Sequence, residues 1–144
     1  MFRLVHYSVQ NDHLHLICEA KNRLSLSRGL QGLCTSIAMR LNRLWVRRGR
    51  VFADRYHDHV LRTPREVRNA LHYLLHNARK HLRSFRSSGP DPFSSGPWFD
   101  GWRACDPLPS PIAMGPIALA RTWLLGTGWR RHGRIPLTPR PRLA

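Results

Sequence analysis

The strongest local constraint on the fold is a helix start at residues 63–66, where the sequence reads TPRE. Thr63 can accept a hydrogen bond as the cap, Pro64 suits the first helical position, and Glu66 can bond back to the cap. Apolar side chains then recur at helical spacing, which predicts an amphipathic helix over residues 64–82. Its apolar stripe consists of Val67, Ala70, Leu71, Leu74, Ala78 and Leu82.

Two strands and another helix are expected before this capped helix. Residues 2–10 and 13–20 are rich in β-branched and aromatic side chains, and the Asn-Asp pair between them favours a turn, so an antiparallel hairpin is predicted. Residues 26–48 predict an amphipathic helix, capped by Ser25 or Ser27 and with Gly49 near its end. Residues 50–62 alternate in part and are expected to be extended as a third strand.

This order, β-β-α-β-α, predicts an α+β fold with two regions. Residues 1–83 form the expected core. Residues 84–144 are rich in glycine, proline and serine and are expected to form an irregular, basic and partly disordered extension, with a short helix around residues 117–125. Packing is the favoured role of three aromatic residues there, ahead of base stacking: Trp98, Phe99 and Trp102.

The charge of the chain indicates a polyanionic partner. The formal net charge is +16 at pH 7, and only Lys21 and Lys80 among the 24 basic residues are lysines. Arginine binds phosphate through a planar fork of donors and also stacks on bases, so nucleic acid is the expected partner.

The cysteines and the apolar segments bear on the compartment. The three cysteines have no C-x-x-C spacing, which favours a reducing, cytoplasmic location over a disulfide framework or a zinc ribbon. The most apolar stretch, residues 111–129, is interrupted by Pro116 and Arg121, and no membrane anchor is expected.

Two pairs of residues could carry chemistry. His13 and His15 alternate with leucine, so they share one face of a strand and could form half of a metal site; the alternative is an exposed or hydrogen-bonded pair. Tyr73 and Asn77 lie four residues apart on one face of the capped helix. Helix spacing alone favours the alternative, a tyrosine at the core boundary and an exposed asparagine.

Rival residues exist for both roles. Tyr56 precedes a second H-x-H pair, His57 and His59. His72 and His76 lie four residues apart on the capped helix, a spacing that could bind zinc. A zinc-dependent hydrolase is a distant alternative, because no glutamate lies in an H-E-x-x-H context.

The H-x-H pair on a strand, followed by Tyr73 and Asn77 on a later helix of a very basic chain, resembles the REP-associated tyrosine transposases. These are single-tyrosine members of the HUH endonucleases that act on single-stranded DNA. The resemblance covers residues 5–20, 49–57, 65–81, 91–102 and 121–133. It implies a ferredoxin-like antiparallel sheet with helices on one face, a divalent cation (Mg²⁺ or Mn²⁺) on His13 and His15, and Tyr73 as the nucleophile. Asn77 stands where related members complete the metal site.

The resemblance also implies a reaction and its partners. Tyr73 would form a 5′-phosphotyrosine bond and release a 3′-OH at hairpin-forming repeats, in a bacterial protein that is cytoplasmic, associated with the nucleoid when bound to DNA, and homodimeric. The arginines expected to contact the DNA, mainly through its backbone, are Arg40, Arg43, Arg47, Arg48, Arg55, Arg65, Arg68 and Arg79.

The sequence departs from the family at its start. Family members normally begin with a further strand and helix, and this sequence begins after them. A late start codon, a decayed gene copy and a short form rescued by dimerisation are three explanations. The alternative function is therefore a catalytically inactive, truncated protein that still binds DNA.

Overall fold

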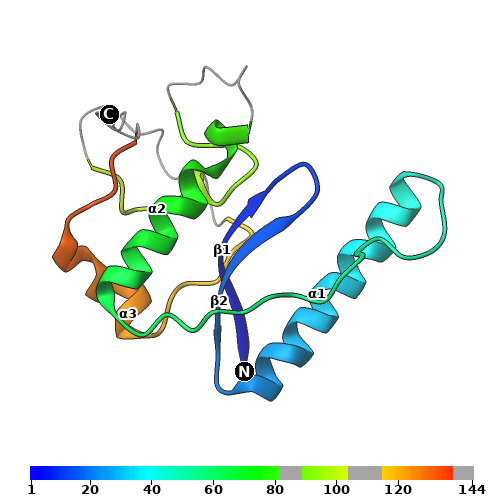
Figure 1. The fold of residues 1–144 in the computed structure, drawn as a ribbon, viewed down its shortest axis with the longest axis horizontal. Helices are drawn as coiled ribbons and strands as arrows, with labels where there is room; N and C mark the ends of the chain where they lie inside the picture. Colours follow the sequence, from blue (N-terminus) through cyan, green and yellow to red (C-terminus); the bar gives the residue numbers. More distant parts are fainter. Residues whose placement is uncertain (82–88, 104–114, 138–144) are drawn as a thin grey trace. The chain divides into compact units, whose positions relative to one another are not determined.

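The computed structural model describes residues 1–81, 89–103 and 115–137, and within them the chain is a mixed α+β protein (Figure 1). Two antiparallel strands form one sheet, which confirms the predicted hairpin. In chain order the elements are β1 (Phe2–Val9), β2 (Leu14–Ala20), α1 (Arg23–Leu44), α2 (Pro64–His81), η1 (Gly96–Trp98), α3 (Trp123–Gly126) and η2 (Gly128–His132).

The chain divides into two compact units. The first comprises Met1–Arg3 and Glu19–Val60, and the second comprises Leu4–Cys18 and Leu61–Ala144. The expected boundary after residue 83 falls in the segment 82–88, which lies outside the described residues. The expected disorder at the end of the chain likewise falls on residues 138–144, outside the described part.

The predicted helix start before α2 is confirmed in detail. The Thr63 hydroxyl accepts a hydrogen bond from the Glu66 backbone N–H at 3.2 Å, and Glu66 Oε2 accepts one from the Thr63 N–H at 3.0 Å. This reciprocal pair satisfies donors that the first helical turn leaves without partners. The apolar stripe of α2 is buried at Val67, Leu71 and Leu74.

Helix α1 starts earlier than predicted, and its cap is Asn22 rather than Ser25 or Ser27. The Asn22 side chain accepts a hydrogen bond from the Ser25 backbone N–H at 2.8 Å. Asparagine is a strong N-cap, so the helix begins as soon as β2 has ended. Gly29 lies within the helix, where the ring of Phe2 approaches its backbone so closely that a Cβ would collide with it.

Helix α1 also ends earlier than predicted, at Leu44 instead of near residue 48. The backbone of Val46 turns to a φ of 50°, a left-handed conformation that a β-branched residue adopts only at a cost. Gly49, with a φ of 104°, lies in the turn that follows and not at the helix end.

The predicted third strand is wrong: residues 50–62 form no strand in the structure. The reason is visible in residues 54–59, where Tyr56 is the single apolar side chain. Neither face of a strand made from this segment could be buried, and Tyr56 and Val60 are both exposed.

The C-terminal extension completes the core of the second unit. Its aromatic residues Phe99, Trp102 and Trp129 are buried in one cluster with Leu71 and Leu75 of α2. The buried indoles are hydrogen-bonded: Trp102 Nε1 donates to the Gly96 carbonyl at 3.0 Å, and Trp129 Nε1 donates to the Leu125 carbonyl at 3.1 Å.

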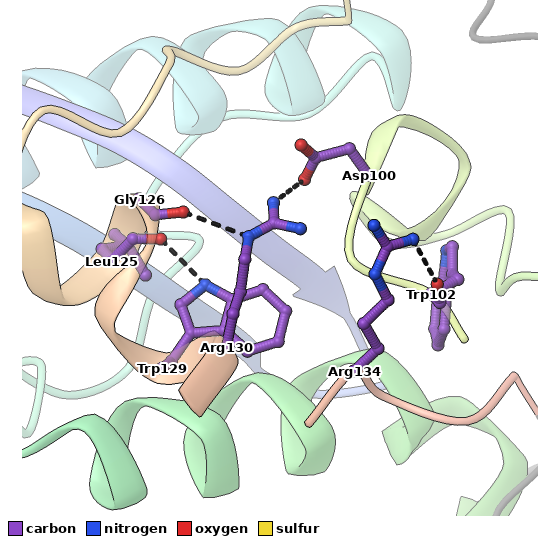
Figure 2. Close-up of polar contacts among 7 residues, drawn as sticks. All are labelled: Asp100, Trp102, Leu125, Gly126, Trp129, Arg130 and Arg134. Atoms are coloured by element: carbon purple, nitrogen blue, oxygen red, sulfur yellow. Dashed lines mark hydrogen bonds and ion pairs between the residues drawn. The ribbon is translucent and has the colours of Figure 1, made fainter. Parts of the chain in front are cut away.

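Arginine side chains at the surface of the C-terminal extension make hydrogen bonds and an ion pair within it (Figure 2). Arg130 lies over the Trp129 ring and pairs with Asp100 at 2.8 Å, while Arg134 donates to the Trp102 carbonyl at 3.5 Å. Arg68 of α2 donates from Nε to the Gly133 carbonyl at 2.9 Å. The described parts of the extension are therefore bound to α2 by side-chain as well as apolar contacts.

The extension also bonds to the backbone of β1. The Val9 N–H donates to the Phe93 carbonyl, and the Ser95 N–H donates to the Tyr7 carbonyl, each at 2.8 Å. The Ser95 hydroxyl lies 3.1 Å from Nδ1 of the buried His6. Residues far apart in sequence thus extend the hydrogen bonding of the hairpin.

Among the described residues, no helix is long and apolar enough to cross a membrane. Cys18 and Cys34 carry free thiols, and Cys105 lies outside the described part of the chain. Burial raises the pKa of Cys18 to about 11, which suppresses its thiolate form.

Replacement of Val46 by glycine should stabilise the first unit. Glycine adopts a positive φ without the steric cost that valine meets there, so we expect the free energy of unfolding to rise by about 1 kcal/mol. Urea denaturation followed by circular dichroism measures the change. Leu44→Gly is the control: it lies in the last helical turn and should lower stability, and a loss for both variants would contradict the assignment of strain to Val46.

Stability should fall in acid because of His6. Burial lowers the pKa of His6 from 6.5 to about 4, against a smaller opposing effect of Asp100. The unfolded chain therefore binds more protons than the folded chain between these two values. As pH falls from about 6.5 to about 4, the stability contributed by neutral His6 is lost, by about 3 kcal/mol in total.

Chemical denaturation across this pH range measures the loss. His6→Asn removes the titrating ring, so its stability should depend less steeply on pH than that of the wild type. Parallel pH profiles for the two proteins would show that His6 contributes nothing to acid sensitivity.

Candidate functional site

His13 and His15 lie side by side at the start of β2, as the alternation of a strand predicts. Their ring centroids are 4.7 Å apart at an interplanar angle of 87°, and the two Nε2 atoms are 3.0 Å apart. The two Nε2 atoms are within hydrogen-bond distance, so one imidazole donates to the other. The turn between β1 and β2 ends immediately before His13 and fixes how the two strands pair, so it determines the face of the hairpin on which both histidines lie.

Asp12 orients the first imidazole. Its Oδ1 lies 2.6 Å from His13 Nδ1, and a carboxylate can only accept, so His13 donates its Nδ1–H. In the neutral ring this leaves the lone pair on Nε2, the atom that faces His15. A carboxylate behind a histidine is a common arrangement around protein-bound metals.

Tyr73 adjoins the histidine pair. Its ring meets the His15 ring edge to face, with centroids 5.2 Å apart. Helix α2 supplies the tyrosine and β2 supplies the histidine, so the contact joins residues far apart in sequence. The side chain of Tyr73 is 44% exposed and can be reached from solvent.

Asn77, one helical turn beyond Tyr73, is fully buried. Neither its Oδ1 nor its Nδ2 has a hydrogen-bond partner among the described residues. Burial of a carboxamide without partners costs free energy, and such groups in native proteins generally have a ligand or a water molecule to bind. Asn77 is therefore not the exposed asparagine that helix spacing alone allowed.

The donor atoms of the pair fit a divalent cation. Two nitrogen ligands about 2.1 Å from one cation are about 3.0 Å apart at a right angle and about 3.4 Å apart in tetrahedral geometry. The two Nε2 atoms, now hydrogen-bonded at 3.0 Å, are therefore close to the separation of a pair of ligands. Imidazole suits manganese better than magnesium. The described residues contain no group of three or more histidine, cysteine, aspartate or glutamate side chains that could hold a metal, and carboxamides such as Asn77 are outside that count.

His72 and His76, the alternative zinc-binding pair on α2, make other contacts in the structure. His76 Nδ1 lies 2.8 Å from the His72 carbonyl, and its Nε2 lies 2.9 Å from the Pro136 carbonyl. Both ring nitrogens of His76 are therefore turned toward carbonyl oxygens and away from any position that a zinc ion shared with His72 could occupy. The second rival group, Tyr56 with His57 and His59, belongs to the first unit and is exposed.

The predicted DNA-binding arginines fall in both units. Five are exposed in the first unit: Arg40, Arg43, Arg47, Arg48 and Arg55. In the second unit Arg65 is exposed, Arg68 is half-buried and bonded to the Gly133 carbonyl, and the side chain of Arg79 lies outside what the structure describes.

Comparisons of the chain with family models, with curated proteins and with solved structures find no match.

Sequence reasoning missed the role of Asp12, which was interpreted only as a turn residue. The signal was present: a carboxylate immediately before the first histidine of an H-x-H pair can fold back onto that ring. It also missed the contact between His6 and Ser95, because residues 89 apart in the chain offer no local pattern.

On the expectation that His13 and His15 hold a divalent cation, Asp12→Ala should weaken the binding of Mn²⁺. Loss of the carboxylate removes the group that holds His13 in its Nδ1–H form, and losses of such partners cost about 10- to 100-fold in metal affinity. Electron paramagnetic resonance of unbound Mn²⁺ in a titration gives the dissociation constant. Asp54→Ala, which changes an exposed aspartate of the first unit, is the control, and equal affinity in all three proteins would exclude this role for Asp12.

Proposed function

We propose that this chain is a metal-dependent DNA strand transferase that cleaves and rejoins single-stranded DNA at hairpin-forming repeats. The proposal includes a ferredoxin-like core, of which β1, β2 and the two long helices would be a part. The observation that carries it is the meeting of His13, His15 and Tyr73, with two nitrogen atoms 3.0 Å apart and a solvent-accessible tyrosine against one of the rings.

His13, His15 and Asn77 are the residues that would hold the cation. A bound divalent cation would polarise a non-bridging phosphate oxygen and reduce its repulsion of a nucleophile. Asp12 supports this role by fixing the tautomer of His13. Asn77 is included because it lies one helical turn beyond Tyr73 and its buried carboxamide oxygen has no hydrogen-bond partner among the described residues.

Tyr73 would perform the covalent step. Its oxygen attacks the phosphorus, a new P–O bond to the tyrosine forms, and the bond from phosphorus to the 3′-oxygen breaks. The tyrosine loses its proton, and the released 3′-oxygen gains one. The 5′-phosphotyrosine retains the energy of the phosphodiester, so a 3′-OH can reverse the step without a nucleotide cofactor.

The charge of the protein supports a nucleic-acid substrate. A net charge of +16 attracts DNA at long range, and exposed arginines in both units offer contacts to its phosphates. The half-exposed Tyr73 is reachable by an unpaired strand.

Tyr73→Phe should abolish covalent capture of DNA. The wild-type protein, mixed with end-labelled single-stranded hairpin DNA and Mn²⁺, should give a labelled band at the protein's mobility on a denaturing gel. Tyr56→Phe is a matched control, because Tyr56 is also 44% exposed. Only the Tyr73 variant should lose the band.

Two results would contradict the proposal. An adduct that persists in Tyr73→Phe would assign the nucleophile elsewhere. Salt-sensitive DNA binding without any adduct in the wild type, unchanged in His13→Ala, would instead identify a catalytically inactive DNA-binding protein.

A further inference from the structure

The last residue of α1 and the turn that follows it expose three consecutive apolar side chains. Leu44, Trp45 and Val46 are 73%, 53% and 93% exposed. We call residues 44–46 the apolar tip. Large apolar side chains gathered at one exposed point, where they contribute nothing to a core, are typical of a binding surface.

The backbone of this turn is held by specific hydrogen bonds. The Arg47 N–H donates to the Asn42 carbonyl at 2.9 Å, and Asn42 Nδ2 donates to the Gly49 carbonyl at 2.8 Å. The guanidinium of Arg47 donates to the Arg50 carbonyl at 2.8 Å. The tip is thus a defined turn and not a frayed helix end.

The conformation of Val46 is a second, independent sign of function. Valine is poorly suited to a φ of 50°, and glycine or asparagine would be less strained there. Strain of this kind persists where the surrounding structure imposes it, and it is concentrated at ligand-binding positions. Here the hydrogen bonds of Asn42 and Arg47 hold the chain on both sides of Val46.

The apolar tip is surrounded by positive charge. Arg43, Arg47, Arg48 and Arg50 are all exposed. No aspartate or glutamate occurs in the sequence between Glu19 and Asp54. The Arg47 guanidinium lies 6.0 Å from the centroid of the Trp45 ring. An aromatic plane next to a fixed guanidinium, within a cluster of arginines, suits a ligand with flat rings on an anionic backbone.

We propose that the apolar tip and its arginines bind single-stranded DNA, with an unpaired base stacked on Trp45 and the arginines on the adjoining phosphates. Stacking on aromatic side chains combined with a basic surface is how proteins bind unpaired strands without reading sequence. Leu44 and Val46, which are exposed next to Trp45 in the chain, would add apolar surface to this contact.

Single-stranded DNA fits this surface better than a membrane or a second copy of the chain. Three apolar residues at a tight turn offer little area for burial in lipid or in a dimer. A second copy would bring the same arginine cluster against itself. The inference rests on the proposed function only for the identity of the nucleic acid, and it does not depend on chemistry at Tyr73.

The test is DNA binding by the full chain in EDTA, where metal-dependent cleavage cannot contribute. Fluorescence anisotropy of a labelled single-stranded oligothymidylate gives the dissociation constant. Trp45→Ala should weaken binding at least about fivefold, as expected for the loss of one stacked base. Trp45→Phe keeps an aromatic plane and should bind nearly as well as the wild type.

Trp123→Ala is a matched control. Trp123 is 52% exposed and carries the guanidinium of Arg131 at 4.9 Å, but it belongs to the second unit. Its replacement should leave the affinity for oligothymidylate unchanged. On a fully paired duplex, Trp45→Ala should stay within about twofold of the wild type, because phosphate contacts remain.

Photocrosslinking of the wild-type chain provides a readout that does not depend on any variant. DNA containing 5-bromodeoxyuridine should crosslink to the tryptic peptide of residues 44–47. A crosslink found only elsewhere, equal losses in the two alanine variants, or Trp45-dependent binding to anionic vesicles in place of DNA would each overturn the inference.

The covalent assay separates this inference from the proposed function. If Trp45→Ala binds oligothymidylate as well as the wild type and Tyr73 still forms an adduct, only the inference about the tip fails. If the tip binds DNA but no adduct forms, only the proposed chemistry fails.

Discussion

Burial of one face of α2 is the constraint on which the second unit depends. A two-stranded hairpin has too little apolar surface to be stable alone in water. Val5 and Ile17 of the hairpin are buried in one cluster with Val67, Leu71 and Leu74 of α2, and Phe99, Trp102 and Trp129 of the extension complete the cluster. The same packing holds His15 of β2 against Tyr73 of α2. The candidate site is therefore a consequence of how the core is assembled.

Local signals in the sequence predicted the elements that are stabilised locally. The capping box before α2 and the turn between β1 and β2 act over three or four residues, so their residues could be read directly. The third strand was predicted from a partial alternation in residues 50–62, but a strand needs a buried face as well as an extended backbone. Its polar run at residues 54–59 provides no such face. The bounds of α1 were displaced because Asn22 and Val46, which define its ends, were not recognised as an N-cap and a left-handed residue.

The candidate site was predictable in part for the same reason. Alternation placed His13 and His15 on one face, and helical spacing placed Tyr73 and Asn77 together. No rule of spacing could show that Tyr73 would meet His15, because that contact depends on the packing of α2 on the hairpin. The resemblance to a transposase family supplied this pairing as an expectation. The buried, unpartnered carboxamide of Asn77 and the carboxylate behind His13 became visible only with the fold.

The core of the second unit joins residues from both ends of the described chain, from Val5 to Ile135. Such long-range contacts make folding slow, because large loops must close before their contacts stabilise anything. During synthesis on the ribosome, the hairpin and α2 emerge well before Trp102, Trp129 and Ile135, the residues that help to cover them. The nascent chain must therefore carry an exposed apolar helix face until its extension has been made, and in that interval it is vulnerable to aggregation.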